Sequence, residues 1–100
     1  MGWTMNDTFY VAPGQTINIW FAWERPGNRG AQWVMGHPEP GEYGTLSTER
    51  VGKKARCTIA QVAGGKYSCG APSSAYWEYF TDIRNFDSNA CKFKLDGGGV

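Results

Sequence analysis

The sequence AYWEYFTDI, residues 75–83, decides the fold class of this chain. Successive side chains of a β-strand point to opposite faces of the sheet, so this stretch places aromatic rings on both faces. Trp77, Tyr79 and Ile83 share one face, which we assign to the core. The opposite face carries Tyr76, Glu78 and Phe80. A strand of this kind either has a binding surface on its outer side or is covered on both sides.

The stretch QTINIWFAW, residues 15–23, shows the same alternation. We assign one of its faces to the core, namely Ile17, Ile19, Phe21 and Trp23. The other face is predicted to lie outside and comprises Thr16, Asn18, Trp20 and Ala22. Trp20 is therefore expected among polar and small residues, because residues two apart in a strand share a face.

Turns rich in Gly, Pro, Asn and Ser separate these stretches from their neighbours at intervals of roughly 8–12 residues, which is typical of all-β folds. We predict strands at 7–12, 15–23, 31–36, 44–50, 54–62, 65–69, 75–84 and 90–95, with a turn at VGKK, residues 51–54. In AQWVM, residues 31–35, Trp33 and Met35 compete with Val34 for the core, and we assign Trp33 inward.

The chain is therefore expected to form one domain over residues 1–100. We predict an antiparallel two-sheet β-sandwich of about 7–8 short strands, immunoglobulin-like or jelly-roll-like, with Greek-key connections. The Gly-rich end, residues 96–100, is predicted to be a frayed tail.

The charge, apolar runs and motifs of the chain make several classes of function less probable than others. The 100 residues have a formal net charge of +1, which gives no electrostatic case for nucleic acid as a partner. The longest apolar run, IWFAW, is too short to span a membrane, and the first residues lack the pattern of a signal peptide. No Gly-rich phosphate loop and no CxxC spacing occurs, so we expect neither a cofactor nor a bound metal.

Three cysteines, Cys57, Cys69 and Cys91, leave the redox compartment open. A hairpin centred at Ala63 brings Cys57 and Cys69 into near register, which makes a disulfide geometrically feasible. Free thiols in the core are equally consistent with an odd number of cysteines. If the bridge forms, the protein is secreted or extracytoplasmic and Cys91 is a buried free thiol.

The sequence contains little evidence for a catalytic site. The only histidine, His37, lies in the turn-rich segment GHPEPG, and no G-x-S-x-G sequence supplies a nucleophile for it. A group of oxygen-bearing side chains near the end of the chain lacks the calcium-loop spacing and is better explained by turns: Asp82, Asn85, Asp87 and Asn89. We therefore expect a protein that is not an enzyme.

The aromatic content exceeds what the core needs, with 5 Trp, 5 Tyr and 5 Phe. Exposed rings beside polar groups suit sugars, which have one apolar and one hydroxylated side. The sequence thus favours a carbohydrate-binding module or small lectin, provided that strands 15–23 and 75–84 share a sheet. The predicted ligand-binding residues are Trp20, Tyr76, Glu78, Phe80, Asp82 and Arg84.

Two alternative hypotheses also account for these rings. The rings would suit a protein interface, including a homo-oligomer or a self-assembling structural sandwich, because a sheet covered on both faces is apolar on both. The third hypothesis is a peripheral membrane-binding protein or toxin component, since aromatic rings beside lysines favour the headgroup region of a bilayer.

Overall fold

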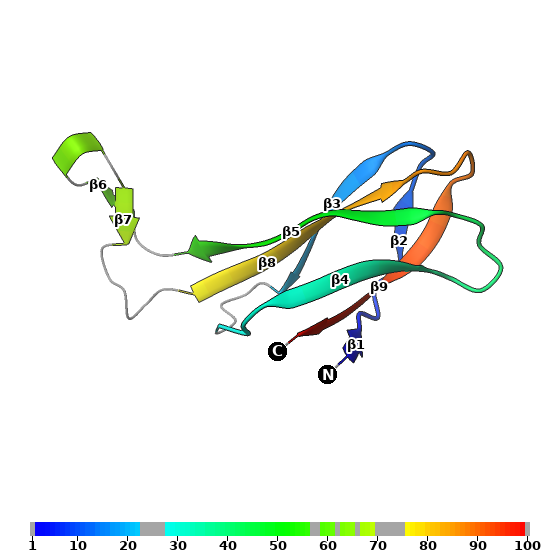
Figure 1. Ribbon diagram of the computed structural model, residues 1–100, viewed down its shortest axis with the longest axis horizontal. Helices are drawn as coiled ribbons and strands as arrows, with labels where there is room; N and C mark the ends of the chain where they lie inside the picture. Colours follow the sequence, from blue (N-terminus) through cyan, green and yellow to red (C-terminus); the bar gives the residue numbers. More distant parts are fainter. Residues whose placement is uncertain are drawn as a thin grey trace.

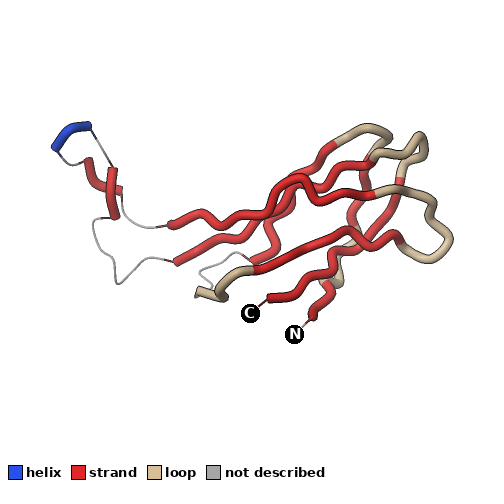
Figure 2. Tube along the Cα trace, in the orientation of Figure 1, coloured by secondary structure: helices blue, strands red, loops and turns tan. Residues whose placement is uncertain are grey.

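The computed structural model describes residues 2–22, 28–56, 59–61, 63–65, 67–69 and 76–99. The described part of the chain is all-β, with two main antiparallel sheets and no α-helix (Figure 2). The predicted fold class, a two-sheet β-sandwich, is confirmed.

One sheet is built around β9 (Cys91–Gly99), and we call it the β9 sheet. The strand β4 (Gln32–Pro38) pairs with β9 along seven residues. The short strands β1 (Gly2–Thr4) and β2 (Phe9–Val11) pair one after the other along the opposite edge of β9. The first and last described residues of the chain therefore lie side by side (Figure 1).

The other sheet, the β8 sheet, has the order β3–β8–β5. Its central strand β8 (Tyr76–Asn85) lies between β3 (Thr16–Ala22) and β5 (Leu46–Arg56). Between β2 and β5 the chain passes from one sheet to the other at every connection, so an up-and-down order is excluded.

The strands β5 and β8 continue together beyond the sandwich as a two-stranded arm (Figure 1). The far end of the arm carries the hairpin of β6 (Ile59–Gln61) and β7 (Tyr67–Cys69), with a 3-10 turn at Ala63–Gly65 between them. The molecule is consequently elongated, measuring 53 × 30 × 19 Å.

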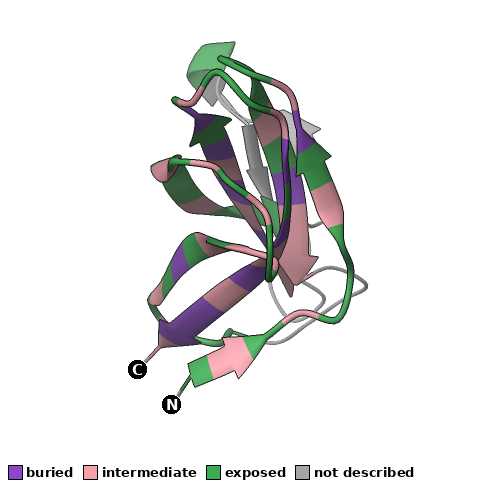
Figure 3. Ribbon diagram, turned by 90° about the vertical axis from the view of Figure 1, so that its right-hand side faces the viewer, coloured by how far each residue is buried: buried purple, intermediate pink, exposed green. Residues whose placement is uncertain are grey.

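The core lies between the two sheets and follows the alternation of the strands (Figure 3). From Tyr79 to Asn85 every second residue of β8 is buried, which confirms the predicted inward face over this part, whereas Trp77, also predicted inward, is only half-buried. The buried apolar residues of the core are Val11, Ile19, Val34, Ile83, Cys91, Phe93 and Leu95. Burying one large apolar side chain contributes roughly 1.5–3 kcal/mol, so this layer supplies much of the driving force for folding.

Asn85 is fully buried at the end of β8, and its amide is satisfied by the backbone. Its Nδ2 donates to the carbonyl of Asn89 at 2.7 Å, and its Oδ1 accepts from the backbone N–H of Asp87 at 3.0 Å. Asp87 in turn accepts from the N–H of Ser88 at 2.8 Å. These local side-chain to backbone bonds are those of a turn, as the sequence predicts.

The prediction of a frayed tail at 96–100 is wrong for residues 96–99, which belong to β9 and pair with β1 and β4. Glycine is required there because side chains of neighbouring strands cross β9. A Cβ atom at Gly97 would overlap the ring of Trp3, and one at Gly98 would overlap the ring of Trp33. These glycines make room for rings and do not mark a flexible end.

The predicted turn at 51–54 is also wrong, because β5 continues without interruption from Leu46 to Arg56. Gly52 lies directly opposite Phe80, and a Cβ atom at this position would approach the Phe80 ring to 2.7 Å. The glycine that suggested a turn therefore serves to let a ring lie across the strand.

Candidate functional site

The outer face of the β8 sheet brings together the residues that the sequence predicts as a binding platform. The strands 15–23 and 75–84 do share this sheet, and the register pairs Trp20 with Phe80. Asn18 lies opposite Asp82 in the same ladder. We call this surface the platform face. It carries Thr16, Asn18, Trp20, Ser47, Arg50, Gly52, Lys54, Arg56, Tyr76, Glu78, Phe80, Asp82 and Arg84.

Two rings lie side by side at the middle of the platform face. The ring centroids of Trp20 and Phe80 are 5.3 Å apart, with an interplanar angle of 55°. The guanidinium of Arg50 lies 4.8 Å from the Phe80 centroid on the other side, while Gly52 leaves space beneath the ring. The rings are tilted, so a ligand ring would stack on one of them at a time.

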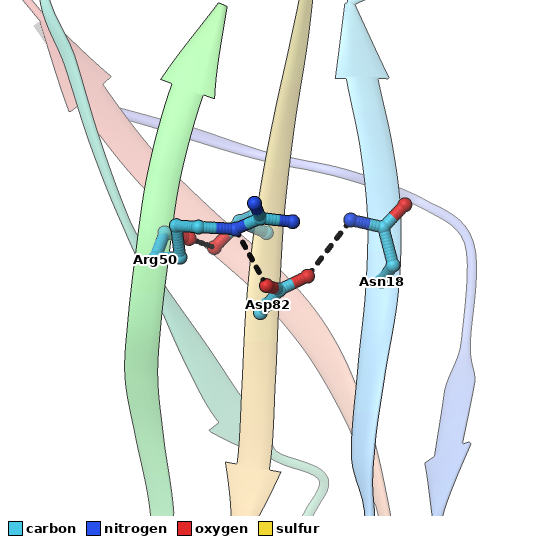
Figure 4. A network of polar contacts seen from close by, with 4 residues as sticks. Asn18, Arg50 and Asp82 are labelled. Atoms are coloured by element: carbon cyan, nitrogen blue, oxygen red, sulfur yellow. Dashed lines mark hydrogen bonds and ion pairs between the residues drawn. The ribbon is translucent and has the colours of Figure 1, made fainter.

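Asp82 is the centre of a polar network next to these rings (Figure 4). It accepts a hydrogen bond from Asn18 Nδ2 at 2.8 Å and another from Arg50 Nε at 2.7 Å. Its side chain is 18% exposed, whereas that of Arg50 is 61% exposed. The carboxylate is therefore held in place by its neighbours, and the guanidinium that holds it has N–H groups available to solvent.

The two ends of the platform face carry the other predicted residues. Toward the arm, Arg56 Nε lies 3.2 Å from Glu78 Oε1 in an ion pair, and half-buried Tyr76 is the cross-strand neighbour of Arg56. At the other end Arg84 is exposed, with its guanidinium 4.6 Å from the ring of Phe86. All six predicted site residues thus lie on one face.

The predicted outward position of Ala22, at the end of β3, is wrong. The register shifts between Trp20 and Ala22, so that Ala22 lies opposite the buried residue Tyr79 and not on the platform face. A β-bulge adds one residue to a strand, and it reverses the alternation beyond that point. Trp23 lies outside the described residues.

The outer face of the β9 sheet carries exposed rings that are not among the predicted binding residues. Trp33 is 56% exposed and Val34 is buried, which corrects the inward assignment of Trp33. Met35 and Tyr10 are also more than half exposed on this side. We call Trp33 and Met35, both on β4, the exposed patch; Tyr10 lies on the other edge of β9, opposite Lys92. The signal that would have found it is Gly98, whose missing side chain lets the Trp33 ring lie across β9.

His37 and Asp96 lie beside the exposed patch. His37 Nδ1 is 3.6 Å from Asp96 Oδ2, and Thr4 Oγ1 donates to Asp96 Oδ1 at 2.8 Å. Both His37 and Thr4 are exposed. A carboxylate orients the only histidine, but a threonine that donates to that carboxylate is not placed to be activated by the imidazole.

A cavity of about 260 Å³ opens at one end of the sandwich, between the sheets. Trp3 and Phe21 stack there with their centroids 5.4 Å apart, and Trp3 Nε1 donates to Gln32 Oε1 at 3.2 Å. Trp3 is partly buried against the core and is thus part of the interior wall of the fold.

The cysteine prediction falls partly outside the described residues, since Cys57 is not among them. Cys69 in β7 lies opposite Ile59, and the bridge to Cys57 stays a prediction. Cys91 is a free, buried thiol, which both alternatives predict, so it does not choose between them. Burial raises the pKa of Cys91, as do the negative charges of Glu42 and Asp87, so this thiol stays protonated at neutral pH.

No family model, no curated protein and no solved structure matches this chain. Within the described ranges, no helix is long and apolar enough to cross a membrane. The same residues contain no cluster of three His, Cys, Asp or Glu side chains that would hold a metal ion.

Proposed function

We propose that this protein recognises carbohydrate and that the platform face is its binding site. The observation that supports the proposal is the position of the Trp20 and Phe80 rings directly beside the network of Asn18, Arg50 and Asp82. A row of apolar groups and a row of hydrogen-bonding groups therefore lie next to each other across one sheet.

A sugar ring suits such a surface for a physical reason. Its C–H face stacks on an aromatic ring, while its hydroxyls exchange hydrogen bonds with carboxylates, amides and guanidinium groups at the edge. The platform residues are held before a ligand arrives, because Asp82 has two protein partners and Phe80 is supported from both sides. A preorganised site avoids much of the entropic cost of ordering side chains on binding.

The test is a glycan-array screen of the wild-type protein beside two variants, Trp20→Ala and Trp33→Ala. The two substitutions remove the same side chain from opposite outer faces, so Trp33→Ala is the matched control. We expect saturable binding that Trp20→Ala reduces at least roughly tenfold, which is the loss expected for a stacking residue at a binding site. Binding by Trp33→Ala should equal that of the wild type.

The proposal fails if no glycan binds a folded wild-type protein, or if binding survives Trp20→Ala unchanged. The thermal unfolding midpoint of each variant must be measured alongside, because Trp20 is half-buried. If Trp20→Ala unfolds the protein, Arg50→Gln removes an exposed partner of the same network and is used in its place.

The exposed patch favours a second candidate function, a protein interface. Trp33 and Met35 present apolar surface on the face opposite the platform, and Tyr10 lies farther along the same face. Aromatic residues and Met are enriched in interface cores, so a second copy of the chain or another protein would bury them. Light scattering of the wild type and of Trp33→Ser at several concentrations tests self-association, which the variant should abolish if the patch carries it.

A further inference from the structure

The platform face carries more positive than negative groups. Its cations are Arg50, Lys54, Arg56 and Arg84, and its strand carboxylates are Glu78 and Asp82. Exposed Glu49, at the β-bulge of β5, adds a third carboxylate, and the cations still exceed the anions. The excess of positive charge on this face is therefore small, and is no larger than the net charge of +1 of the whole chain.

The distribution of these charges matters more than their sum. Asp82 and Glu78 are each within ion-pair distance of an arginine of the same face, Arg50 at 2.7 Å and Arg56 at 3.2 Å. Among the described residues, Lys54 and Arg84 form no ion pair with a carboxylate. Both side chains are exposed, so the face offers two cations that lack an anionic partner within this part of the chain.

Lys54 and Arg84 lie on either side of the ring pair. Lys54 is the cross-strand neighbour of Glu78, two residues from Phe80 along β8, and Arg84 is four residues from Phe80 in the other direction. At a rise of about 3.3 Å per residue, the two cations are roughly 20 Å apart along the strand. This span exceeds one sugar and matches a chain of several sugars.

We infer that the ligand of the platform face is an acidic polysaccharide whose uronate carboxylates bind Lys54 and Arg84 while a pyranose ring stacks on Trp20. This inference rests on the proposed carbohydrate-binding function. A carboxylate is the anion for which the face already shows partners, because Arg50 and Arg56 each pair with one. The planar guanidinium of Arg84 has the geometry to bind a carboxylate through two N–H groups.

The test compares two probes with the same sugar backbone, polygalacturonate and its uncharged methyl ester, by isothermal titration calorimetry with the full chain. We expect the acid to bind and the ester to bind at least roughly tenfold more weakly, with affinity for the acid falling as salt is raised. The variant Lys54→Gln with Arg84→Gln should lose about tenfold in affinity for the acid, the loss expected for two exposed ion pairs.

The matched control is Lys92→Gln with Lys94→Gln, which removes the same charge from β9 in the other sheet. Its affinity for the acid should equal that of the wild type. An equal loss in both double variants overturns the inference, since attraction would then follow net charge alone. Tighter binding of dextran sulfate or of a poly(dT) oligonucleotide than of polygalacturonate also overturns it.

The proposed carbohydrate-binding function and the inference of an acidic ligand can be disproved separately. If acid and ester bind equally well and Trp20→Ala abolishes both, the platform face binds carbohydrate but its ligand is not acidic. If the acid binds and Trp20→Ala has no effect, the cations act without the rings, and both the inference and the proposed site are wrong. If neither probe binds but the array finds a neutral glycan, only the inference falls.

Discussion

The two outer faces of the sandwich hold their aromatic rings in different ways. On the platform face, Trp20 and Phe80 lie against each other, and Arg50 covers the far side of Phe80. On the β9 sheet, the Trp33 ring lies across Gly98 and remains more than half exposed. A ring surrounded by polar partners can orient a ligand, whereas a bare ring contributes mainly apolar area.

The largest loss of stability is expected from substitution of a glycine of β9. Gly97→Ala forces the Trp3 ring out of its stack with Phe21 inside the fold, and we expect a loss of about 3 kcal/mol of unfolding free energy, typical of overpacking. Gly98→Ala displaces only the exposed Trp33 ring and should cost no more than about 1 kcal/mol. Urea unfolding followed by tryptophan fluorescence measures both.

Equal losses in these two glycine variants would contradict the comparison. They would mean that Trp33 is packed as firmly as Trp3, and the exposed patch would then be part of the structural framework.

A smaller difference in stability is expected between variants of the two aspartates, Asp82 on the platform face and Asp96 on the β9 sheet. Asp82→Asn weakens the bonds to Asn18 and Arg50 at a site where the aspartate is 18% exposed, and we expect a loss of about 1 kcal/mol. Asp96 is 35% exposed, so Asp96→Asn should lower the free energy of unfolding by less than about 0.5 kcal/mol. Thermal or urea unfolding at neutral pH distinguishes them, and the reverse order would show that the platform network does not preorganise Asp82.

Sequence alternation predicts the platform face but not the exposure of Trp33, and the reason is physical. In residues 16–19 and 82–84 polar residues alternate with isoleucine, which indicates the inner face of each strand although rings lie on both faces of the second. In AQWVM, apolar residues occupy both faces, so the pattern alone leaves Val34 and Trp33 as rivals for the core. The choice depends on Gly98, which is far away in sequence and opposite Trp33 in the sheet.

The same long-range dependence accounts for the wrong predictions of a turn at 51–54 and of a frayed tail at 96–100. Glycine is ordinarily evidence for a turn or a flexible end. Gly52, Gly97 and Gly98 lie in strands because rings of neighbouring strands occupy the space above them. The residues next to each glycine in the sequence do not indicate which ring lies over it. Pairing the Gly-rich strand with a Trp-containing strand in the correct register identifies that ring.

Stability should also depend differently on the two tryptophans of the outer faces, Trp33 and Trp20. Trp33→Ser should change the unfolding free energy by less than about 1 kcal/mol, because more than half of the side chain is already in solvent. Trp20→Ser, on the platform face, removes a half-buried ring in contact with Phe80 and should cost about 2 kcal/mol. Iodide quenching supplies an independent readout, since Trp33→Ser should remove a strongly quenched part of the emission and Trp20→Ser should not. If the two variants are equally stable and lose equally quenched emission, the faces hold their rings alike, and the basis for placing the sugar site on the platform face disappears.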